Sequence, residues 1–103
     1  MSNTAFNIRQ GALAGEVVIS GRLDASQSDA ALAFLNQVTQ PQVIDLAGLE
    51  YIASAGLRVI LLTQKRCKAQ GPGVRLINVA PAIYDIFRYA GFDQIIDITR
   101  AAS

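Results

Sequence analysis

The sequence predicts a single α/β domain with a mostly parallel, mixed β-sheet and helices packed mainly on one face. The chain has 103 residues, which suits one domain spanning 1–103. Short apolar runs with strand periodicity alternate with longer segments whose apolar residues recur at helical spacing. Alternation of this kind favours right-handed crossovers and a largely parallel sheet. The expected element order is β-β-α-β-α-β-α-β.

The first two elements are strands close enough in sequence to form an antiparallel hairpin. Phe6 and Ile8 alternate with polar neighbours, which is a strand pattern. A turn bounded by glycines follows, and Val17, Val18 and Ile19 lead to Leu23 in the second strand. Gly21 lies near the end of that strand and indicates a bulge or a close backbone approach.

A helix and a buried strand follow the hairpin. Ser26 or Ser28 can cap this helix, and Asp29 suits the positive end of its dipole. Pro41 ends the helix. The mostly apolar run over 43–46 has few turn residues, which is typical of a strand buried on both faces of a parallel sheet.

The segment 49–52 is expected to connect this strand to a second helix, from about Ser54 to Ala69. Three cations crowd the last turn of this helix, where positive charge complements the helix dipole. Its core stripe is expected to contain Leu57, Ile60 and Leu61.

The final third of the chain predicts a strand, a helix and a last strand. The strand covers 74–79, and Pro81 suits the first position of the helix. Gly91 ends that helix. The isoleucines within 95–98 form the last strand.

Composition excludes several classes of function. The net charge is +1, and hydrophobic residues make up 51% of the chain, so neither disorder nor a dominant nucleic-acid-binding or membrane-binding patch is indicated. Cys67 is the one cysteine and there is no histidine. An internal disulfide, a Cys/His zinc site and a histidine-based triad are therefore excluded. No Gly-x-Gly-x-x-Gly or Walker loop is present, and we expect no cofactor and no metal.

The N-terminal sequence and the apolar runs indicate a cytoplasmic protein. Met1–Thr4 lacks a basic start followed by an apolar run, so no signal peptide is expected. The longest apolar stretches are far shorter than a membrane span.

Ser54 is the most informative residue because it is a lone hydroxyl among small residues at a predicted helix start. Its neighbours Ala53, Ala55 and Gly56 leave it little steric cover. A helix N-terminus presents free N–H groups and partial positive charge, and it can hold a phosphate. Serine at such a position is most often an N-cap, and a capping serine can also accept a phosphate.

Four motifs together resemble the signature of STAS domains, over nearly the whole chain and in the right order. They are Gly21-Arg-Leu-Asp24, Asp45-Leu-x-Gly-Leu49, Tyr51-Ile-Ala-Ser-Ala-Gly-Leu57, and Pro81-Ala-Ile-Tyr-Asp-Ile-Phe87 with Gly91-Phe92. The chain looks most like bacterial anti-sigma factor antagonists, which stand as isolated STAS domains. The resemblance implies a non-enzymatic regulator. The sequence does not fix the oligomeric state, and we expect a monomer when the protein is free.

The resemblance also implies a partner-switching cycle. In that cycle the unmodified antagonist binds an anti-sigma factor that is a serine kinase, and the sigma factor is released. The kinase then phosphorylates the serine that corresponds to Ser54, and the antagonist dissociates. A metal-dependent Ser/Thr phosphatase resets it. A charge added at an exposed helix start is expected to change docking more than folding.

A partner-facing surface around Ser54 follows from the same resemblance. For Asp24 the alternative is a turn or helix-start role, and for Arg58 it is a solvated helix face. The residues expected to bind the partner are Arg22, Asp24, Ala53, Ser54, Ala55, Gly56, Leu57 and Arg58.

The chain departs from the family pattern at Ala53-Ser54-Ala55-Gly56, where the family often has Asp-Ser-Ser/Thr-Gly. Ser54 is thereby the one phosphoacceptor of the motif, and an acidic residue that a kinase can recognise is absent. The departure keeps a second role open, a constitutive STAS subunit of a lipid-transport ATPase complex or a stressosome-like scaffold. A small hydrolase using Asp24 and Asp45 is a third, disfavoured hypothesis, because Asp45 lies within an apolar strand.

Overall fold

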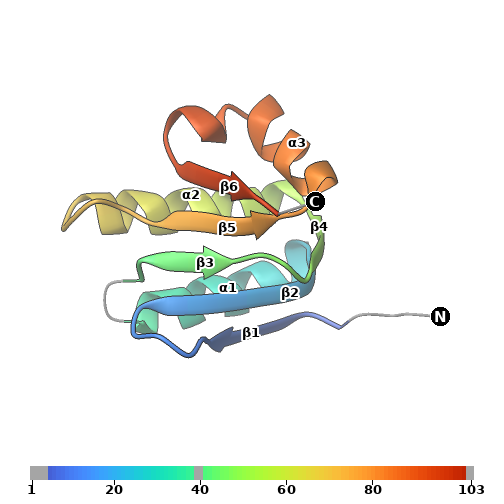
Figure 1. Ribbon diagram of the computed structural model, residues 1–103. Helices are drawn as coiled ribbons and strands as arrows, with labels where there is room; N and C mark the ends of the chain where they lie inside the picture. Colours follow the sequence, from blue (N-terminus) through green and yellow to red (C-terminus); the bar gives the residue numbers. More distant parts are fainter. Residues whose placement is uncertain (1–4, 39–40, 102–103) are drawn as a thin grey trace.

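The computed structural model describes residues 5–38 and 41–101, in which six strands form one mixed sheet (Figure 1). Met1–Thr4, on which the signal-peptide expectation rests, lies outside these residues. Along the chain the elements are β1 (Asn7–Gln10), β2 (Glu16–Leu23), α1 (Ala25–Gln37), β3 (Val43–Asp45), β4 (Leu49–Ile52), α2 (Ser54–Lys68), β5 (Arg75–Val79), α3 (Pro81–Tyr89), the short 3-10 helix η1 (Phe92–Gln94) and β6 (Asp97–Arg100).

The strand order β1-β2-β3-β5-β6 confirms a mostly parallel, mixed sheet. β1 and β2 form the expected antiparallel hairpin, with Ile8 opposite Ile19. The pairs β2–β3, β3–β5 and β5–β6 are parallel, and β4 pairs in parallel with the end of β2. The carboxyl ends of the parallel strands therefore share one edge of the sheet, which in Figure 1 lies to the right.

The helices confirm the expectation that one face of the sheet is covered. α1 and α2 pack side by side behind the sheet in Figure 1, and α3 contacts β4, β6 and η1. Val17, Ile19 and Ile44 point into this core and are fully buried. Val43 and Asp45 on β3 are only partly buried. The prediction that this strand is buried on both faces was wrong, since none of the described helices covers its second face.

The segment Leu49–Ile52, expected to be a connection, is strand β4. A bulge between Gly21 and Arg22 shifts the register of β2, and after it Leu23 pairs with Ile52. Gly21 has φ of +82°, and a Cβ there would collide with the carbonyl oxygen of Ala5. The bulge and the close backbone approach expected from Gly21 are therefore both present.

The core stripe of α2 differs from the predicted one. Leu57 and Leu61 are only partly buried, whereas Thr63 is fully buried and donates its hydroxyl proton to the carbonyl oxygen of Val59 (2.9 Å). A hydroxyl satisfied within its own helix can face the core at little cost. The buried residues of α2 are Gly56, Val59, Ile60, Thr63, Gln64 and Cys67.

The end of the chain also differs from expectation. Gly91 ends α3 with φ of +82°, as predicted. The turn η1 follows, and Phe92 packs on Phe87 with ring centroids 5.6 Å apart. Ile95 and Ile96 therefore precede β6 instead of beginning the last strand, and Ile95 is 53% exposed. In the described part of the chain, no helix is long and apolar enough to cross a membrane.

Candidate functional site

The starts of α1 and α2 meet at the carboxyl edge of the sheet. β2 leads directly into α1, and β4 leads directly into α2. The Ala53 N–H donates to the Leu23 carbonyl oxygen (3.0 Å), which ties the two strand ends together. The structure thus brings Asp24 and Ser54, predicted to share one surface, to the same edge.

Ser54 is the first residue of α2, and its side chain is exposed. The N-cap position belongs to Ala53, whose carbonyl oxygen accepts from the Leu57 N–H (2.9 Å) and whose side chain cannot cap the helix. The interpretation of Ser54 as an N-cap was therefore wrong. Its hydroxyl is not needed to start the helix, which leaves it available for chemistry.

The start of α2 is electrostatically suited to an added phosphate. Its first turn contains no acidic residue and has no side-chain cap. Its unpaired N–H groups and dipole favour a negative charge at Ser54. Arg58 is exposed one turn further on, at the i+4 position that faces Ser54 along a helix.

Gly56 fixes how closely this helix start approaches the sheet. It is buried, and a Cβ there would lie 2.8 Å from both the Ile52 side chain and the Leu23 carbonyl oxygen. No residue larger than glycine fits without a shift. Gly56 therefore positions Ser54 by allowing the helix start to lie close against the sheet. A direct contact between Gly56 and a partner stays a prediction.

Asp24 is the N-cap of α1. Its Oδ1 accepts from the Ser26 N–H (3.1 Å) and the Ser26 hydroxyl (2.8 Å), while Ser28 donates to the Asp24 carbonyl oxygen (2.8 Å). The prediction of a serine cap was wrong, because both serines bond back to Asp24. Asp29 lies beyond the first turn. The Asp24 carboxylate thus has the helix-start role, and its contact with a partner stays a prediction.

Asp24 gives the domain a measurable acid sensitivity. The Ser26 hydrogen bond holds the pKa of the Asp24 carboxyl below its usual value of 3.8. A folded-state pKa below the unfolded one adds stability above pH 3.8 that is lost as the pH falls through the folded value. We therefore expect the wild type to melt at a higher temperature than Asp24→Asn at pH 7, with the difference shrinking below pH 4. Scanning calorimetry across this range checks it, and a pH-independent difference would contradict it.

Arg22 and Tyr51 add a cationic and aromatic patch to the same edge. They are paired across β2 and β4, and the Arg22 guanidinium lies 4.2 Å from the centre of the Tyr51 ring. Both side chains are exposed. Sequence reasoning predicted a role for Arg22 but missed Tyr51, because only the unexpected pairing of β4 with β2 brings them together. Aromatic and arginine side chains are enriched at protein interfaces.

The remaining predicted site residues divide by exposure. Ala53, Ala55 and Leu57 are partly buried, and Arg58 is exposed. Asp45 accepts from the Ala47 N–H (2.9 Å), so its carboxylate holds a turn. The Asp24 carboxylate caps a helix and the Asp45 carboxylate stabilises a turn, each by accepting a backbone N–H. This is the geometry of structural carboxylates and not of a catalytic pair. The edge thus presents an exposed hydroxyl on an uncapped helix start, beside an exposed arginine–tyrosine pair.

A family model described as "Mlab, STAS domain" matches residues 6–98. The chain belongs to the STAS domain family. It is 33% identical over 79 residues to BtrV of Bordetella bronchiseptica, a protein named as an anti-sigma factor antagonist. That match covers 76% of this STAS chain and 68% of BtrV.

Solved structures show the same STAS fold. An anti-sigma factor antagonist of Thermotoga maritima superposes with a TM-score of 0.73 at 18% identity, over 91% of this chain and 85% of that one. The Bacillus protein SpoIIAA superposes in its phosphorylated form (TM-score 0.65, 19% identity, 91% and 90% covered) and in its unphosphorylated form (0.68, 20%, 91% and 87%).

Proposed function

We propose that this STAS domain is a non-enzymatic anti-sigma factor antagonist that works by partner switching. Its partner is an anti-sigma factor with serine kinase activity, which it binds when Ser54 is unmodified. Phosphorylation of Ser54 releases the partner, and a metal-dependent Ser/Thr phosphatase restores binding. The similarity to BtrV over 76% of the chain supports this class of partner.

The exposed Ser54 hydroxyl at the first position of α2 is the observation that carries the proposal. Small residues surround it, and Gly56 holds the helix start firmly against Leu23. A kinase can therefore reach the hydroxyl without unfolding the helix. A partner that covers this edge would desolvate a new phosphate, which is costly unless basic groups face it.

The exposed residues around Ser54 have defined roles in this proposal. Arg22 with Tyr51, and Arg58 one turn along α2, form the polar and aromatic rim of the docking surface. Leu57 and the small residues at 53 and 55 provide its centre. The domain itself tolerates the phosphate because the helix dipole favours negative charge at this end.

A second candidate function is a constitutive STAS subunit of a larger assembly, such as a lipid-transport ATPase complex or a scaffold. The description of the matching family model, "Mlab, STAS domain", does not specify an anti-sigma factor antagonist and is compatible with this candidate. Ala53, in place of the acidic residue that often precedes the serine, favours it as well.

Affinity capture separates the two functions. Immobilised Ser54→Ala protein, which cannot be released by phosphorylation, is incubated with lysate of the native host without added ATP. We expect mass spectrometry to identify an anti-sigma factor with a kinase domain among the retained proteins, and Arg22→Glu bait to lose it. Retention of a transport ATPase or a scaffold protein would instead establish the constitutive role.

A further inference from the structure

A groove lies between the second half of α2 and the segment around η1, away from the edge that carries Ser54. Its volume is about 470 Å³. Lys65 follows Ser54 by eleven residues, which corresponds to about 16 Å along a helix axis. We call it the basic groove, and its lining residues are Leu61, Gln64, Lys65, Lys68, Gln94 and Ile95.

The apolar part of the basic groove comes from Leu61 and Ile95. Ile95 is 53% exposed, although it lies directly before a buried residue, Ile96. The turn η1 directs it away from the core. A large aliphatic side chain exposed in a hollow provides an anchor point for an apolar side chain of a binding partner.

The charge of the basic groove has one sign. Lys65 and Lys68 lie on its rim, and none of its six lining residues is acidic. Among residues 5–38 and 41–101, the ion pair seen is between Arg88 and Asp85 and involves neither lysine. These lysines create a positive potential over an apolar floor.

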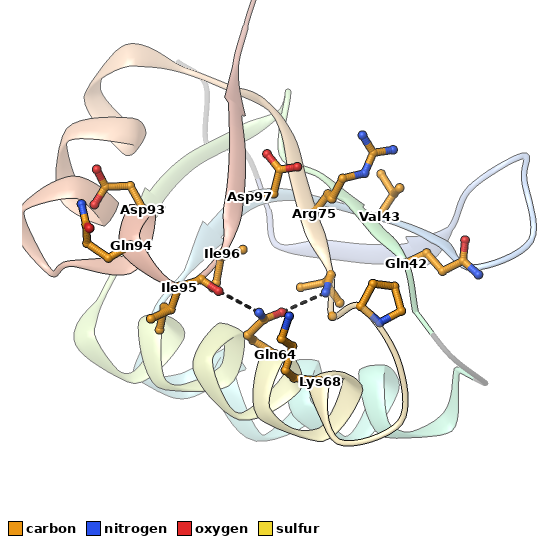
Figure 2. A pocket seen from close by; sticks show the side chains of 13 residues that line it. Gln42, Val43, Gln64, Lys68, Arg75, Asp93, Gln94, Ile95, Ile96 and Asp97 are labelled. Atoms are coloured by element: carbon orange, nitrogen blue, oxygen red, sulfur yellow. Dashed lines mark hydrogen bonds between the residues drawn. The ribbon is translucent and has the colours of Figure 1, made fainter.

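The adjoining hollow is different in charge. It has a volume of about 500 Å³ and shares Gln64, Lys68, Gln94 and Ile95 with the basic groove. Figure 2 shows Arg75 and Asp97 there, and Asp93 also lines it. Acidic and basic groups balance in this hollow, and Lys68 lies where it meets the basic groove, so the net positive charge is at the Lys65 end of the groove.

Gln64 keeps the basic groove in shape. Its side-chain amide is buried, donates to the Ile95 carbonyl oxygen (2.9 Å) and accepts from the Val74 N–H (2.8 Å), as the dashed lines in Figure 2 show. Gly73 makes room for it, because a Cβ there would lie 2.7 Å from Gln64 Oε1. A wall fixed before binding lowers the entropy cost of docking.

We propose that the basic groove is a second docking site that takes an acidic segment of a partner protein, with an apolar residue of that segment seated on Leu61 and Ile95. Carboxylates of the segment pair with Lys65 and Lys68. Two cations are fewer than the four to eight basic residues typical of an anionic-membrane site. No aromatic platform for stacking bases lines the groove, which disfavours single-stranded nucleic acid.

This site is independent of the proposed switch. A separation of about 16 Å along α2 exceeds the screening length of about 8 Å at physiological ionic strength. A phosphate on Ser54 is therefore expected to leave the basic groove unchanged. A partner held at both surfaces would lose one contact and keep the other.

The probe is a synthetic peptide with two leucines flanked by aspartates and glutamates, titrated into ¹⁵N-labelled full-length protein. Its control peptide has asparagine and glutamine at the acidic positions. We expect changes in amide chemical shift confined to residues 61–68 and 94–95. Binding of the acidic peptide should be weaker at high salt. Lys65→Gln with Lys68→Gln should lower the affinity about tenfold, as should Ile95→Ser, whereas Arg9→Gln on β1 should not.

Four outcomes would overturn the proposal. They are no saturable shifts at millimolar peptide, equal binding of the neutral peptide, shifts centred on the Ser54 edge, or affinity unchanged in the lysine variant. Vesicles containing phosphatidylserine are tested in parallel, and binding that needs the same two lysines would assign the groove to a membrane instead. The amide spectra of each variant verify its fold, so a lost interaction is not mistaken for unfolding. Because none of these variants changes Ser54 and none of the measurements uses a kinase, failure of this proposal is distinguishable from failure of the proposed switch.

Discussion

A carboxylate at position 54 is expected to weaken binding of the anti-sigma factor partner by at least about thirtyfold, whereas Ser54→Ala should bind as the unmodified protein does. The reason is that Ser54 is exposed in the free domain and covered in the complex that we propose. Removing a charge from water in an interface that has no matching group on the partner's side costs about 2 kcal/mol or more, and 1.4 kcal/mol corresponds to a tenfold change in affinity. Calorimetric titration of Ser54→Asp into the captured partner measures the loss.

Two controls separate charge from shape and position. Ser54→Asn has the size of the aspartate without its charge and should lose much less affinity. Gln70→Glu adds a negative charge beyond the far end of α2 and should leave the affinity for the partner unchanged. Ser54→Asp should melt no lower than the wild type, because a negative charge suits the uncapped helix start. Equal affinities of Ser54→Asp and Ser54→Ala would rule out the switch.

Gly56→Ala is expected to lower the free energy of unfolding by about 3 kcal/mol, near the top of the range for overpacked cores. The added methyl would lie 2.8–2.9 Å from atoms of Ile52 and Leu23, including a backbone carbonyl oxygen that cannot swing away. Alanine favours helix more than glycine does, so helix propensity alone predicts the opposite sign. Urea denaturation monitored by circular dichroism measures the change.

Gly71→Ala is the matched control for Gly56→Ala. A Cβ at Gly71 would meet its nearest neighbour, the Cys67 carbonyl oxygen, at an ordinary 3.9 Å. Both substitutions reduce the freedom of the unfolded chain in the same way. Gly71 lies outside α2, so helix propensity favours alanine at position 56 alone, and any excess loss of stability at position 56 is a lower bound on the cost of the collision. If the two variants are equally stable, Gly56 does not set the distance between α2 and the sheet. If Gly56→Ala alone is destabilised, it should also bind the partner more weakly, because Ser54 is displaced.

The elements with clear periodicity could be predicted from the sequence. The β1–β2 hairpin, the start of α2 near Ser54 and the end of α3 at Gly91 followed from alternation, small residues and turn chemistry. Strand β4 could not, because Leu49 and Ile52 are buried while the two residues between them are exposed, which breaks the alternation of a strand. Its partner is the part of β2 after a bulge, and local patterns do not encode that pairing.

The positions of the candidate site residues could be predicted where a local signal existed, and their role in binding stays a prediction. A serine between alanines and a glycine marks the start of α2, and Arg22 and Asp24 lie at the same edge as the family resemblance implied. Tyr51 was missed because it reaches Arg22 only through the β4 pairing. The basic groove was missed because the isoleucines of 95–98 resemble a strand, whereas the turn η1 leaves Ile95 exposed.

The proposed partner-switching cycle requires Ser54 to be its phosphoacceptor. Intact-mass spectrometry of the protein after incubation with native-host lysate and Mg-ATP, beside Ser54→Ala, tests it most directly. We expect a single phosphoryl group on the wild type and none on the variant. An unmodified wild type, in lysate where the captured kinase is present and active, or a phosphoryl group on both proteins, would contradict the claim.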